Sequence, residues 1–232
     1  MKISMKKRKI GYTYGSVSGH FAFRKQKSIA FESTLERDLL TLLEFNDSVD
    51  DIIEQPITIE YINSNGRAVT YTPDFLVYFN EFNTSLLKLE RKPLLIEVKP
   101  RDRIIKDWKK LKPKFQIATR YAKENDMKFM IYDEGRIRTQ YLKNILFLKR
   151  YKKVVYESEE EEFILSLIHS TGNITIEYVL EYLTSTKERK GILLGHIWHL
   201  IANKKLLCNL KDTLTIHTQI WIHENIEMKE FQ

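Results

Sequence analysis

Cysteine is almost absent from this chain of 232 residues. The single cysteine, Cys208, cannot form a disulfide within the chain, which is typical of a protein in a reducing compartment. The chain also has no apolar run long enough to span a bilayer, and its N-terminus carries charges where a signal peptide has its apolar core. We therefore expect a soluble cytoplasmic protein without a membrane partner.

Acidic residues are missing from residues 1–31, which contain eight lysines and arginines. Aromatic residues are interleaved with these basic residues, and Phe21-Ala22-Phe23 alternates as a strand does. A solvated basic tail fits this composition, and so does a segment that packs in part and contacts a DNA duplex.

The charge of the chain is unevenly distributed around its net value of +7. Residues 1–154 have a balance of +12, whereas residues 155–232 have a balance of −5. A basic domain is typical of proteins that contact phosphates, and the acidic remainder would be a poor DNA anchor. We therefore predict a basic segment over 1–31, a first domain over 32–154 and a second domain over 155–232.

Two short segments that are typical of strands place charged residues inside apolar runs, at Tyr71–Val77 and Leu94–Pro100. Burying a charge in a protein costs on the order of several kcal/mol unless another charge compensates it. Asp74, Glu97 and Lys99 could compensate one another and a divalent metal. Because side chains alternate along a strand, Glu97 and Lys99 should project from the same face.

This arrangement, Pro-Asp followed by Glu-x-Lys, is that of metal-dependent nucleases. Asp74 and Glu97 offer the hard oxygen ligands that Mg²⁺ prefers, with Mn²⁺ as a possible substitute. Lys99 could orient or deprotonate the attacking water, or stabilise the charge that develops on phosphorus. In the alternative interpretation, Asp74 is a turn residue after Pro73, and Glu97 and Lys99 form the wet face of an edge strand.

A helix is predicted over Ser33–Glu44, because its leucines recur on one face. Ser33 and Glu36 match a capping box, in which the third-position carboxylate reaches back to the start of the helix. The same carboxylate could instead point at a metal as a third ligand. Periodicity alone does not separate these two roles of Glu36.

The remaining elements of the first domain predict an α/β fold with a mixed sheet flanked by helices. Asn65-Gly66 predicts a hairpin between two strands, the first of which is interrupted at Glu54-Gln55-Pro56. Further strands are predicted at 94–98, buried on both faces, and at 127–132. Helices are predicted at 137–151 and at 102–125, the latter broken or kinked at Pro113.

The second domain has the element order of a winged helix. An acidic run at 157–162 opens a first helix, further helices are predicted at 174–183 and 192–207, and a hairpin is predicted at 213–222. His196 and His199 lie three residues apart, and Cys208 follows them. A zinc site would need a fourth ligand, so we interpret the histidines as packed residues.

Five blocks of this sequence resemble the TnsA-type transposon endonucleases in order and spacing. The resemblance covers about residues 11–150, and its blocks are Phe31-Glu32-Ser33-Thr34-Leu35-Glu36, Leu43-Glu44-Phe45, Glu54-Gln55-Pro56, Tyr71-Thr72-Pro73-Asp74-Phe75 and Glu97-Val98-Lys99-Pro100.

The resemblance implies a restriction-endonuclease-like fold in a prokaryotic cytosolic enzyme that cuts the 5′ strand at transposon ends in double-stranded DNA. A separate DDE transposase would cut the 3′ strand, and an AAA+ ATPase would bind the C-terminal domain. The family's catalytic groups fall on Glu36, Asp74 and Lys99, which favours metal binding by Glu36. Glu97 stands where the family also accepts glutamine, and the role of Gln55 stays open.

Two other functions are compatible with the sequence. An autonomous restriction or repair nuclease of the same fold would cleave DNA as the purified chain alone. A non-catalytic regulator would read a major groove with its winged helix, but its predicted third helix, 192–207, carries only Lys204 and Lys205.

Overall fold

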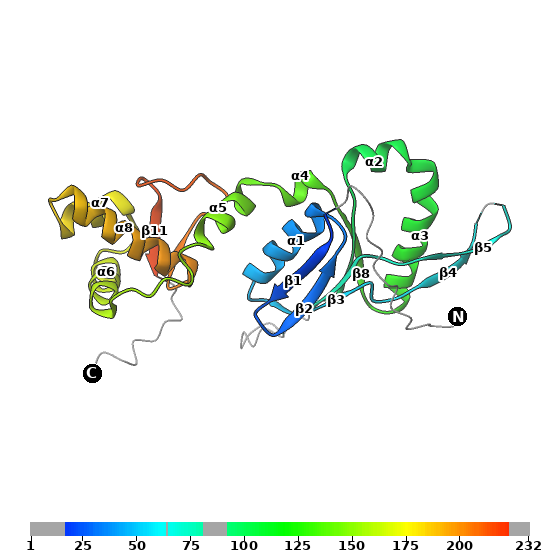
Figure 1. Ribbon diagram of the computed structural model, residues 1–232, viewed down its shortest axis with the longest axis horizontal. Helices are drawn as coiled ribbons and strands as arrows, with labels where there is room; N and C mark the ends of the chain where they lie inside the picture. Colours follow the sequence, from blue (N-terminus) through cyan, green and yellow to red (C-terminus); the bar gives the residue numbers. More distant parts are fainter. Residues whose placement is uncertain (1–16, 64, 81–91, 223–232) are drawn as a thin grey trace. The chain divides into compact units, whose positions relative to one another are not determined.

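The computed structural model describes residues 17–63, 65–80 and 92–222 (Figure 1). The chain divides into two compact units, Met1–Arg138 and Thr139–Gln232. This division lies earlier in the chain than the predicted boundary between residues 154 and 155. No helix in the described ranges is long and apolar enough to cross a membrane.

The first unit is built around a four-stranded sheet. Its strands are β3 (Val49–Glu54), β6 (Phe75–Phe79), β7 (Leu94–Val98) and β8 (Lys128–Tyr132), in the order β3-β6-β7-β8. The pairs β3–β6 and β6–β7 are antiparallel, whereas β7–β8 is parallel. The prediction of a mixed sheet is confirmed, and all five residues of β7 are buried, as their apolar run indicates.

Four helices accompany this sheet: α1 (Thr34–Phe45), α2 (Arg101–Lys106), α3 (Trp108–Glu124) and α4 (Glu134–Ile137). Ala118 and Tyr121 of α3 pack in one core cluster with Leu76 of β6 and Leu95 of β7. The predicted helix over 102–125 is interrupted at Asp107, not at Pro113. Pro113 lies inside α3, in its second turn, where its missing N–H removes one hydrogen bond but does not end the helix.

The two long strands predicted around Asn65-Gly66 are each divided. The hairpin itself is present as β4 (Ile59–Ile62) and β5 (Ala68–Tyr71), which form a separate two-stranded sheet that projects from the central sheet (Figure 1). Gln55, with a φ of 43°, separates β3 from β4, and Pro73, which lacks an N–H, lies between β5 and β6. This division leaves Asp74 at the edge of β6, directly before its first residue.

Part of the predicted N-terminal segment belongs to the first unit. Residues Gly19–Phe23 form β1, which pairs with β2 (Lys27–Phe31), and the aromatic side chains of Phe21, Phe23 and Phe31 are buried. Burial of these rings ties the hairpin to the core, so the first unit includes residues that precede the predicted boundary between residues 31 and 32. Residues 1–16, for which DNA contact was also predicted, lie outside the described residues.

The second unit contains four helices and a three-stranded sheet among its described residues. They are α5 (Gln140–Leu148), α6 (Ser158–Thr171), α7 (Ile176–Leu183) and α8 (Lys187–Ala202), with β9 (Ile174–Thr175), β10 (Leu206–Cys208) and β11 (Gln219–Ile222) in the order β10-β11-β9. Leu148 of α5 belongs to the same core as Ile197 and Leu200 of α8. This shared core explains why the division precedes α5.

Two predicted elements of the second unit differ in the structure. The predicted hairpin over 213–222 is absent, because β11 pairs with β10 and β9, which come from earlier in the chain. The third helix begins at Lys187, five residues before the predicted Ile192, because Thr186 caps it through the Arg189 N–H. The helix therefore contains Lys187, Arg189 and Lys190, whereas Lys204 and Lys205 follow its end.

Candidate active site

Asp74 lies beside the strand that carries Glu97. It directly precedes β6, its N–H donates to the Ile96 carbonyl oxygen at 3.0 Å, and its Oδ2 accepts from the Val98 N–H at 2.6 Å. Ile96 and Val98 flank Glu97 on β7, so the carboxylates of Asp74 and Glu97 are neighbours and their like charges repel. The sheet therefore brings together two carboxylates that lie far apart in the sequence.

Lys99 lies beside Glu97, as the alternation of the strand predicts. Its Nζ donates to Glu97 Oε1 at 2.7 Å, which forms an ion pair with a carboxylate that is only 3% exposed. The other oxygen, Oε2, accepts from the Tyr71 hydroxyl at 2.8 Å. Glu97 is thus a buried carboxylate with both oxygens hydrogen-bonded. The alternative interpretation, in which Glu97 lies on the solvent-exposed face of an edge strand, therefore does not hold.

The ionisable groups of this site perturb one another. Burial, together with the charges of Glu97 and Glu36, raises the pKa of Asp74 well above its usual range, although the Val98 N–H donates to its Oδ2 at 2.6 Å. Burial opposes charge on Lys99, but Glu97, Asp74 and Glu36 outweigh it and raise the pKa of this lysine. Lys99 is therefore a cation at neutral pH.

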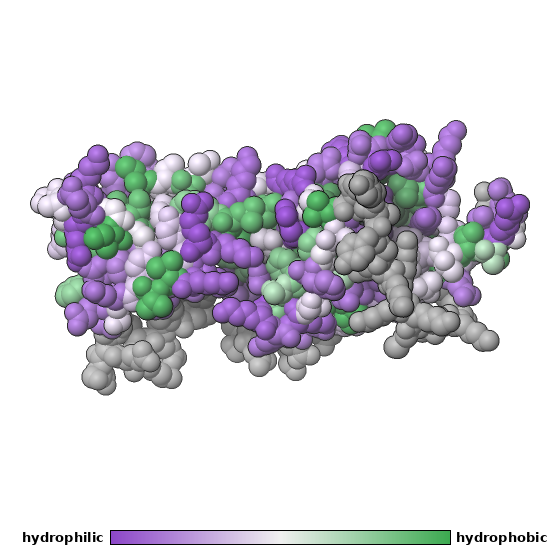
Figure 2. All heavy atoms as spheres, in the orientation of Figure 1, coloured by the Kyte–Doolittle hydropathy of each residue, from purple (hydrophilic) through white to green (hydrophobic). Residues whose placement is uncertain are grey.

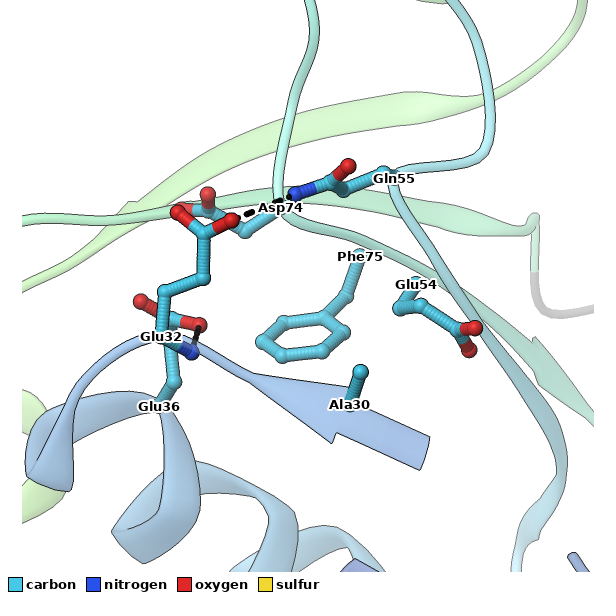
Figure 3. A pocket seen from close by; sticks show the side chains of 7 residues that line it. All are labelled: Ala30, Glu32, Glu36, Glu54, Gln55, Asp74 and Phe75. Atoms are coloured by element: carbon cyan, nitrogen blue, oxygen red, sulfur yellow. Dashed lines mark hydrogen bonds between the residues drawn. The ribbon is translucent and has the colours of Figure 1, made fainter. Parts of the chain in front are cut away.

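Glu36 makes the capping contacts that its position predicts. Its N–H donates to Ser33 Oγ at 3.1 Å, while its carboxylate accepts from the Ser33 hydroxyl at 2.8 Å and from the Glu32 N–H at 2.7 Å. Burial raises the pKa of Glu36 despite these hydrogen bonds. The same side chain lines a small pocket with Asp74 and Phe75 (Figure 3). Glu36 is thus a cap that also faces the site.

Gln55 lines this pocket and was not assigned a role from the sequence. Gln55 Nε2 donates to Glu32 Oε1 at 3.1 Å, and this contact joins the loop after β3 to the end of β2 (Figure 3). The backbone N–H of Gln55 also donates to the Asp74 carbonyl oxygen at 2.8 Å. Gln55 has a positive φ of 43°, which is uncommon for a residue with a side chain. The interruption of a strand pattern by Gln55-Pro56 is the signal that could have pointed to it.

Tyr71 was also not assigned a role. Its ring is buried in the cluster that contains Leu95 and Ala118, and its hydroxyl reaches Glu97. Burial and the neighbouring Glu97 raise the pKa of Tyr71, so its phenol stays a hydrogen-bond donor. A tyrosine that precedes Pro-Asp by two residues is a weak signal, because tyrosine is common in strands.

The carboxylates of the site do not form a ready metal cage. Within residues 17–63, 65–80 and 92–222, no three His, Cys, Asp or Glu side chains are grouped so that they could hold a metal ion as they stand. Protein donors bind both oxygens of Glu97 and both oxygens of Glu36. Metal binding would therefore have to displace some of these donors.

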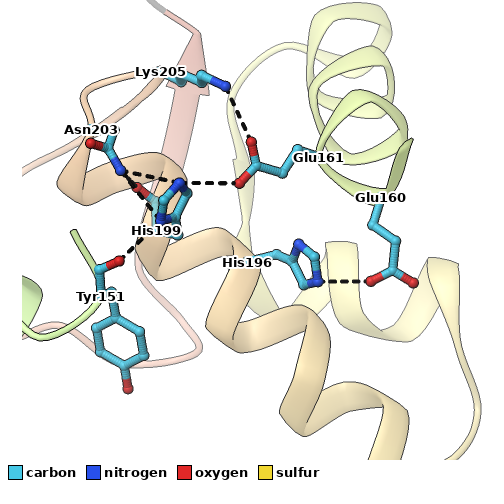
Figure 4. A network of polar contacts seen from close by, with 7 residues as sticks. All are labelled: Tyr151, Glu160, Glu161, His196, His199, Asn203 and Lys205. Atoms are coloured by element: carbon cyan, nitrogen blue, oxygen red, sulfur yellow. Dashed lines mark hydrogen bonds and ion pairs between the residues drawn. The ribbon is translucent and has the colours of Figure 1, made fainter. Parts of the chain in front are cut away.

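The histidines of the second unit form a separate polar network (Figure 4). His196 Nε2 lies 2.9 Å from Glu160 Oε2, whereas His199 Nδ1 lies 3.0 Å from the Tyr151 carbonyl oxygen. The second carboxylate, Glu161, accepts from Lys205 at 3.1 Å. His196 thus binds Glu160 of α6, whereas His199 binds the Tyr151 carbonyl before α6 and lies 3.5 Å from Glu161 Oε1, in keeping with a role in packing.

The basic residues of α8 are largely neutralised. Arg189 pairs with Glu160 of α6, and Lys190 pairs with Glu181 of α7. The predicted composition of this helix was wrong, because its first turn is basic. Since these ion pairs hold two of the three added cations, Arg189 and Lys190, the helix still offers little free positive charge for a DNA groove.

Comparison with known proteins gives two matches to family models. A model described as TnsA-like endonuclease N terminal matches residues 46–134. A model described as TnsA endonuclease C terminal matches residues 136–210. No curated protein matches the chain. The two matches meet close to the division between the two units, at Arg138.

Proposed function

This chain belongs to the TnsA family of transposon endonucleases, and on that basis we propose that it cleaves the 5′ strand at transposon ends in a Mg²⁺-dependent reaction. As a family member it is an endonuclease subunit of a transposase. The observation that carries the proposal is the placement of the Asp74 carboxylate on the Val98 N–H, next to Glu97, with Lys99 bound to Glu97.

The donor set of the site supports Mg²⁺. Asp74 is half-buried, the charges of Glu97 and Glu36 act on it, and Lys99 is the cation that favours its ionised form. A divalent cation held by Asp74 and Glu97 would compensate this excess of negative charge, and hard oxygen ligands suit Mg²⁺. When bound, the ion supplies a Lewis acid for the scissile phosphate and a more acidic water.

Lys99 suits the role of charge stabiliser better than that of general base. The surrounding carboxylates raise its pKa, so it has no free electron pair at neutral pH. A preorganised ammonium beside the site stabilises the negative charge that grows on the phosphoryl oxygens. Tyr71 holds the other side of Glu97 and thereby fixes the carboxylate that orients Lys99.

Glu36 is the third carboxylate of the proposed site. Its present contacts are those of a helix cap, so a metal-binding role requires its side chain to turn from Ser33 towards Asp74. Both residues line one pocket, which makes this a change of side-chain rotamer without a change of backbone. The Gln55 contact with Glu32 would hold the far wall of that pocket in place.

The second unit is proposed to be a winged-helix module that binds protein partners. The order α6, β9, α7, α8, β10, β11 supports a winged helix. Residues 155–232 carry an excess of five negative charges, which disfavours binding to DNA phosphates. We propose that this module binds the AAA+ ATPase regulator, and that a DDE transposase subunit processes the 3′ strand.

A strand-specific cleavage assay tests this function. A duplex that contains a transposon end, labelled on either strand, is incubated with the chain, the transposase subunit and the ATPase in the presence of Mg²⁺ or of EDTA. We expect a Mg²⁺-dependent cut on the 5′ strand that is lost in Asp74→Ala.

Two other results would contradict the proposal. Specific cleavage by the chain alone would favour an autonomous nuclease. Specific DNA binding through the second unit, with no cleavage under any of these conditions, would favour a regulator.

A further inference from the structure

We propose that the segment Arg101–Lys114, which forms α2 and the start of α3, is the surface that holds duplex DNA beside the cut. We call it the α2–α3 corner. The proposal rests on the proposed nuclease function, and it adds the part of the chain that binds the DNA flank and the distance of that contact from the scissile phosphate.

The α2–α3 corner carries a dense positive charge. It contains seven basic residues and two acidic ones. Among the residues that the structure describes, no carboxylate forms an ion pair with any of these basic side chains. They are Arg101, Arg103, Lys106, Lys109, Lys110, Lys112 and Lys114. In α8, in contrast, acids of neighbouring helices pair with Arg189 and Lys190.

The corner also exposes two large apolar side chains. No residue of α2 is buried, and Ile105 is 71% exposed, while Trp108 at the start of α3 is 47% exposed. Single exposed apolar residues are common on protein surfaces. Here, however, they lie among seven cations, and Figure 2 shows hydrophobic atoms within the mostly hydrophilic surface over α2. Aromatic and aliphatic side chains flanked by lysines suit contact with bases or sugars in a groove.

The position of the corner links it to the active site. Pro100, the residue after Lys99, is the N-cap of α2, so the corner begins where the site ends. The Lys99 N–H donates to the Tyr132 carbonyl oxygen at 3.0 Å, and the Arg101 N–H donates to Glu134 Oε2 at 3.0 Å. These two hydrogen bonds anchor the start of the corner at the end of β8.

The length of α2 sets the expected distance of the contact from the cut. Six residues of helix extend about 9 Å at 1.5 Å per residue. At about 3.4 Å per base pair, Trp108 would contact DNA roughly three base pairs from the cut. The contact therefore lies within one turn of the duplex and does not require a separate DNA-binding domain.

The composition of the corner favours nucleic acid over a protein partner. Five of its seven cations are lysines, a residue that is depleted at protein interfaces but effective at phosphate contacts. The charges extend over exposed positions along two helices, which suits the repeated charge of a DNA backbone. An acidic protein would be the alternative occupant, and measurements of DNA binding and of association with the transposase subunit distinguish it from DNA.

The first experiment measures DNA binding without cleavage. The full chain carrying Lys109→Gln, Lys110→Gln and Lys112→Gln is titrated into a fluorescent transposon-end duplex in EDTA at several salt concentrations. These side chains are exposed, so the fold should be kept. We expect at least tenfold weaker binding at about 0.1 M salt, and a slope of log K against log salt that is smaller by up to about 3, since each lost phosphate contact removes about 0.9.

A matched control carries Lys25→Gln, Lys123→Gln and Lys128→Gln, which remove the same charge from exposed positions elsewhere in the first unit. We expect the control to lose clearly less affinity than the corner variant. Equal losses in the two variants, or wild-type affinity in the corner variant, would overturn the proposal. Wild-type DNA binding combined with lost association with the transposase subunit would make the corner a protein interface and would also overturn it.

The second experiment locates the contact. In a Cys208→Ser background, Lys109→Cys or Lys123→Cys is coupled to a short photo-crosslinker and bound to the end duplex. We expect crosslinks from position 109 roughly three to six base pairs from the 5′-strand cut, and few from position 123. Crosslinks spread evenly along the duplex would overturn the proposal.

The two proposals fail in different ways. Crosslinks from the α2–α3 corner to the transposon end without any cleavage would support DNA binding by the corner and would contradict the nuclease function. Cleavage without corner crosslinks would contradict the corner alone.

Discussion

Asp74 and Glu97 lie close together where β6 begins beside β7, and the charge of Glu97 disfavours the ionised form of Asp74, while Lys99 binds Glu97. Such repulsion between carboxylates destabilises the folded protein. Binding of a proton or of a further cation relieves this repulsion, so the stability of the folded protein reports on the charges bound at this site.

Asp74→Asn should raise the melting temperature of the metal-free protein near pH 7. Burial and neighbouring carboxylates raise the pKa of Asp74 in the folded state, so the folded state binds this proton more tightly than the unfolded state does. The contribution of Asp74 to stability is therefore greatest below its unfolded pKa and falls as pH rises towards its folded pKa. Thermal unfolding in EDTA should show a gain of roughly 2 to 4 °C per kcal/mol of relieved repulsion.

The same variant should lose its response to Mg²⁺. Ion binding to the folded state raises the melting temperature of the wild type, and removal of a ligand removes this rise. Cleavage should be abolished as well. A variant that melts lower than the wild type in EDTA and still gains stability from Mg²⁺ would show that Asp74 does not hold the ion.

Lys99→Gln should slow the chemical step by roughly two orders of magnitude or more while DNA binding is kept, as expected for loss of a preorganised charge stabiliser. Single-turnover cleavage and anisotropy measure the two steps separately. Because the carboxylates raise the pKa of Lys99, the wild-type rate should show no decline from loss of this charge up to about pH 9. Normal cleavage with weakened DNA binding in the variant would instead mark Lys99 as a phosphate anchor.

Glu36→Gln separates the two roles of this residue. Glutamine can still accept from the Glu32 N–H and bind the Ser33 hydroxyl, so the loss in unfolding free energy should be at most about 1 kcal/mol. If Glu36 is a metal ligand, cleavage should be lost all the same. Denaturant unfolding and the strand cleavage assay give the two readouts, and full activity would restrict Glu36 to the cap.

Gln55→Gly and Gln55→Ala form a matched pair. Both remove the amide that binds Glu32, so both should lower cleavage to a similar degree. Glycine adopts the positive φ of this position without steric strain, whereas alanine does not. The glycine variant should therefore be more stable than the alanine variant by about 1 kcal/mol. Unchanged cleavage in both variants would show that the Gln55 contact with Glu32 has no role in the site.

A fragment that ends at Arg138 should fold, whereas one that ends at Val154 should tend to aggregate. The longer fragment keeps α5 but loses the core into which Leu148, Phe147 and Tyr151 pack, which would leave these apolar side chains exposed. Size-exclusion chromatography and circular dichroism compare the two. The shorter fragment should still bind DNA in a salt-dependent way, and it should lose association with the ATPase partner. Equal behaviour of the two fragments would place the boundary elsewhere.

Much of the fold could be read from local patterns. The leucine period and the Ser33 cap predict α1, the apolar run predicts the buried strand β7, and Asn65-Gly66 predicts the hairpin. These patterns work because they depend on neighbours within a few residues. The prediction was less accurate where an element needs a distant partner, as when β11 pairs with β10 and not within its own segment.

The sequence by itself determined the chemistry of the site: alternation along one strand places Glu97 and Lys99 on the same side, and the apolar run buries Glu97 within β7, with Lys99 directly after this strand. Only the tertiary structure decided that Asp74 reaches β7 beside Glu97, that Tyr71 holds Glu97 and that Gln55 reaches Glu32. It also assigned α5 to the second unit. The physical reason is that short-range periodicity fixes the direction of a side chain, whereas strand register and long-range burial select its partner.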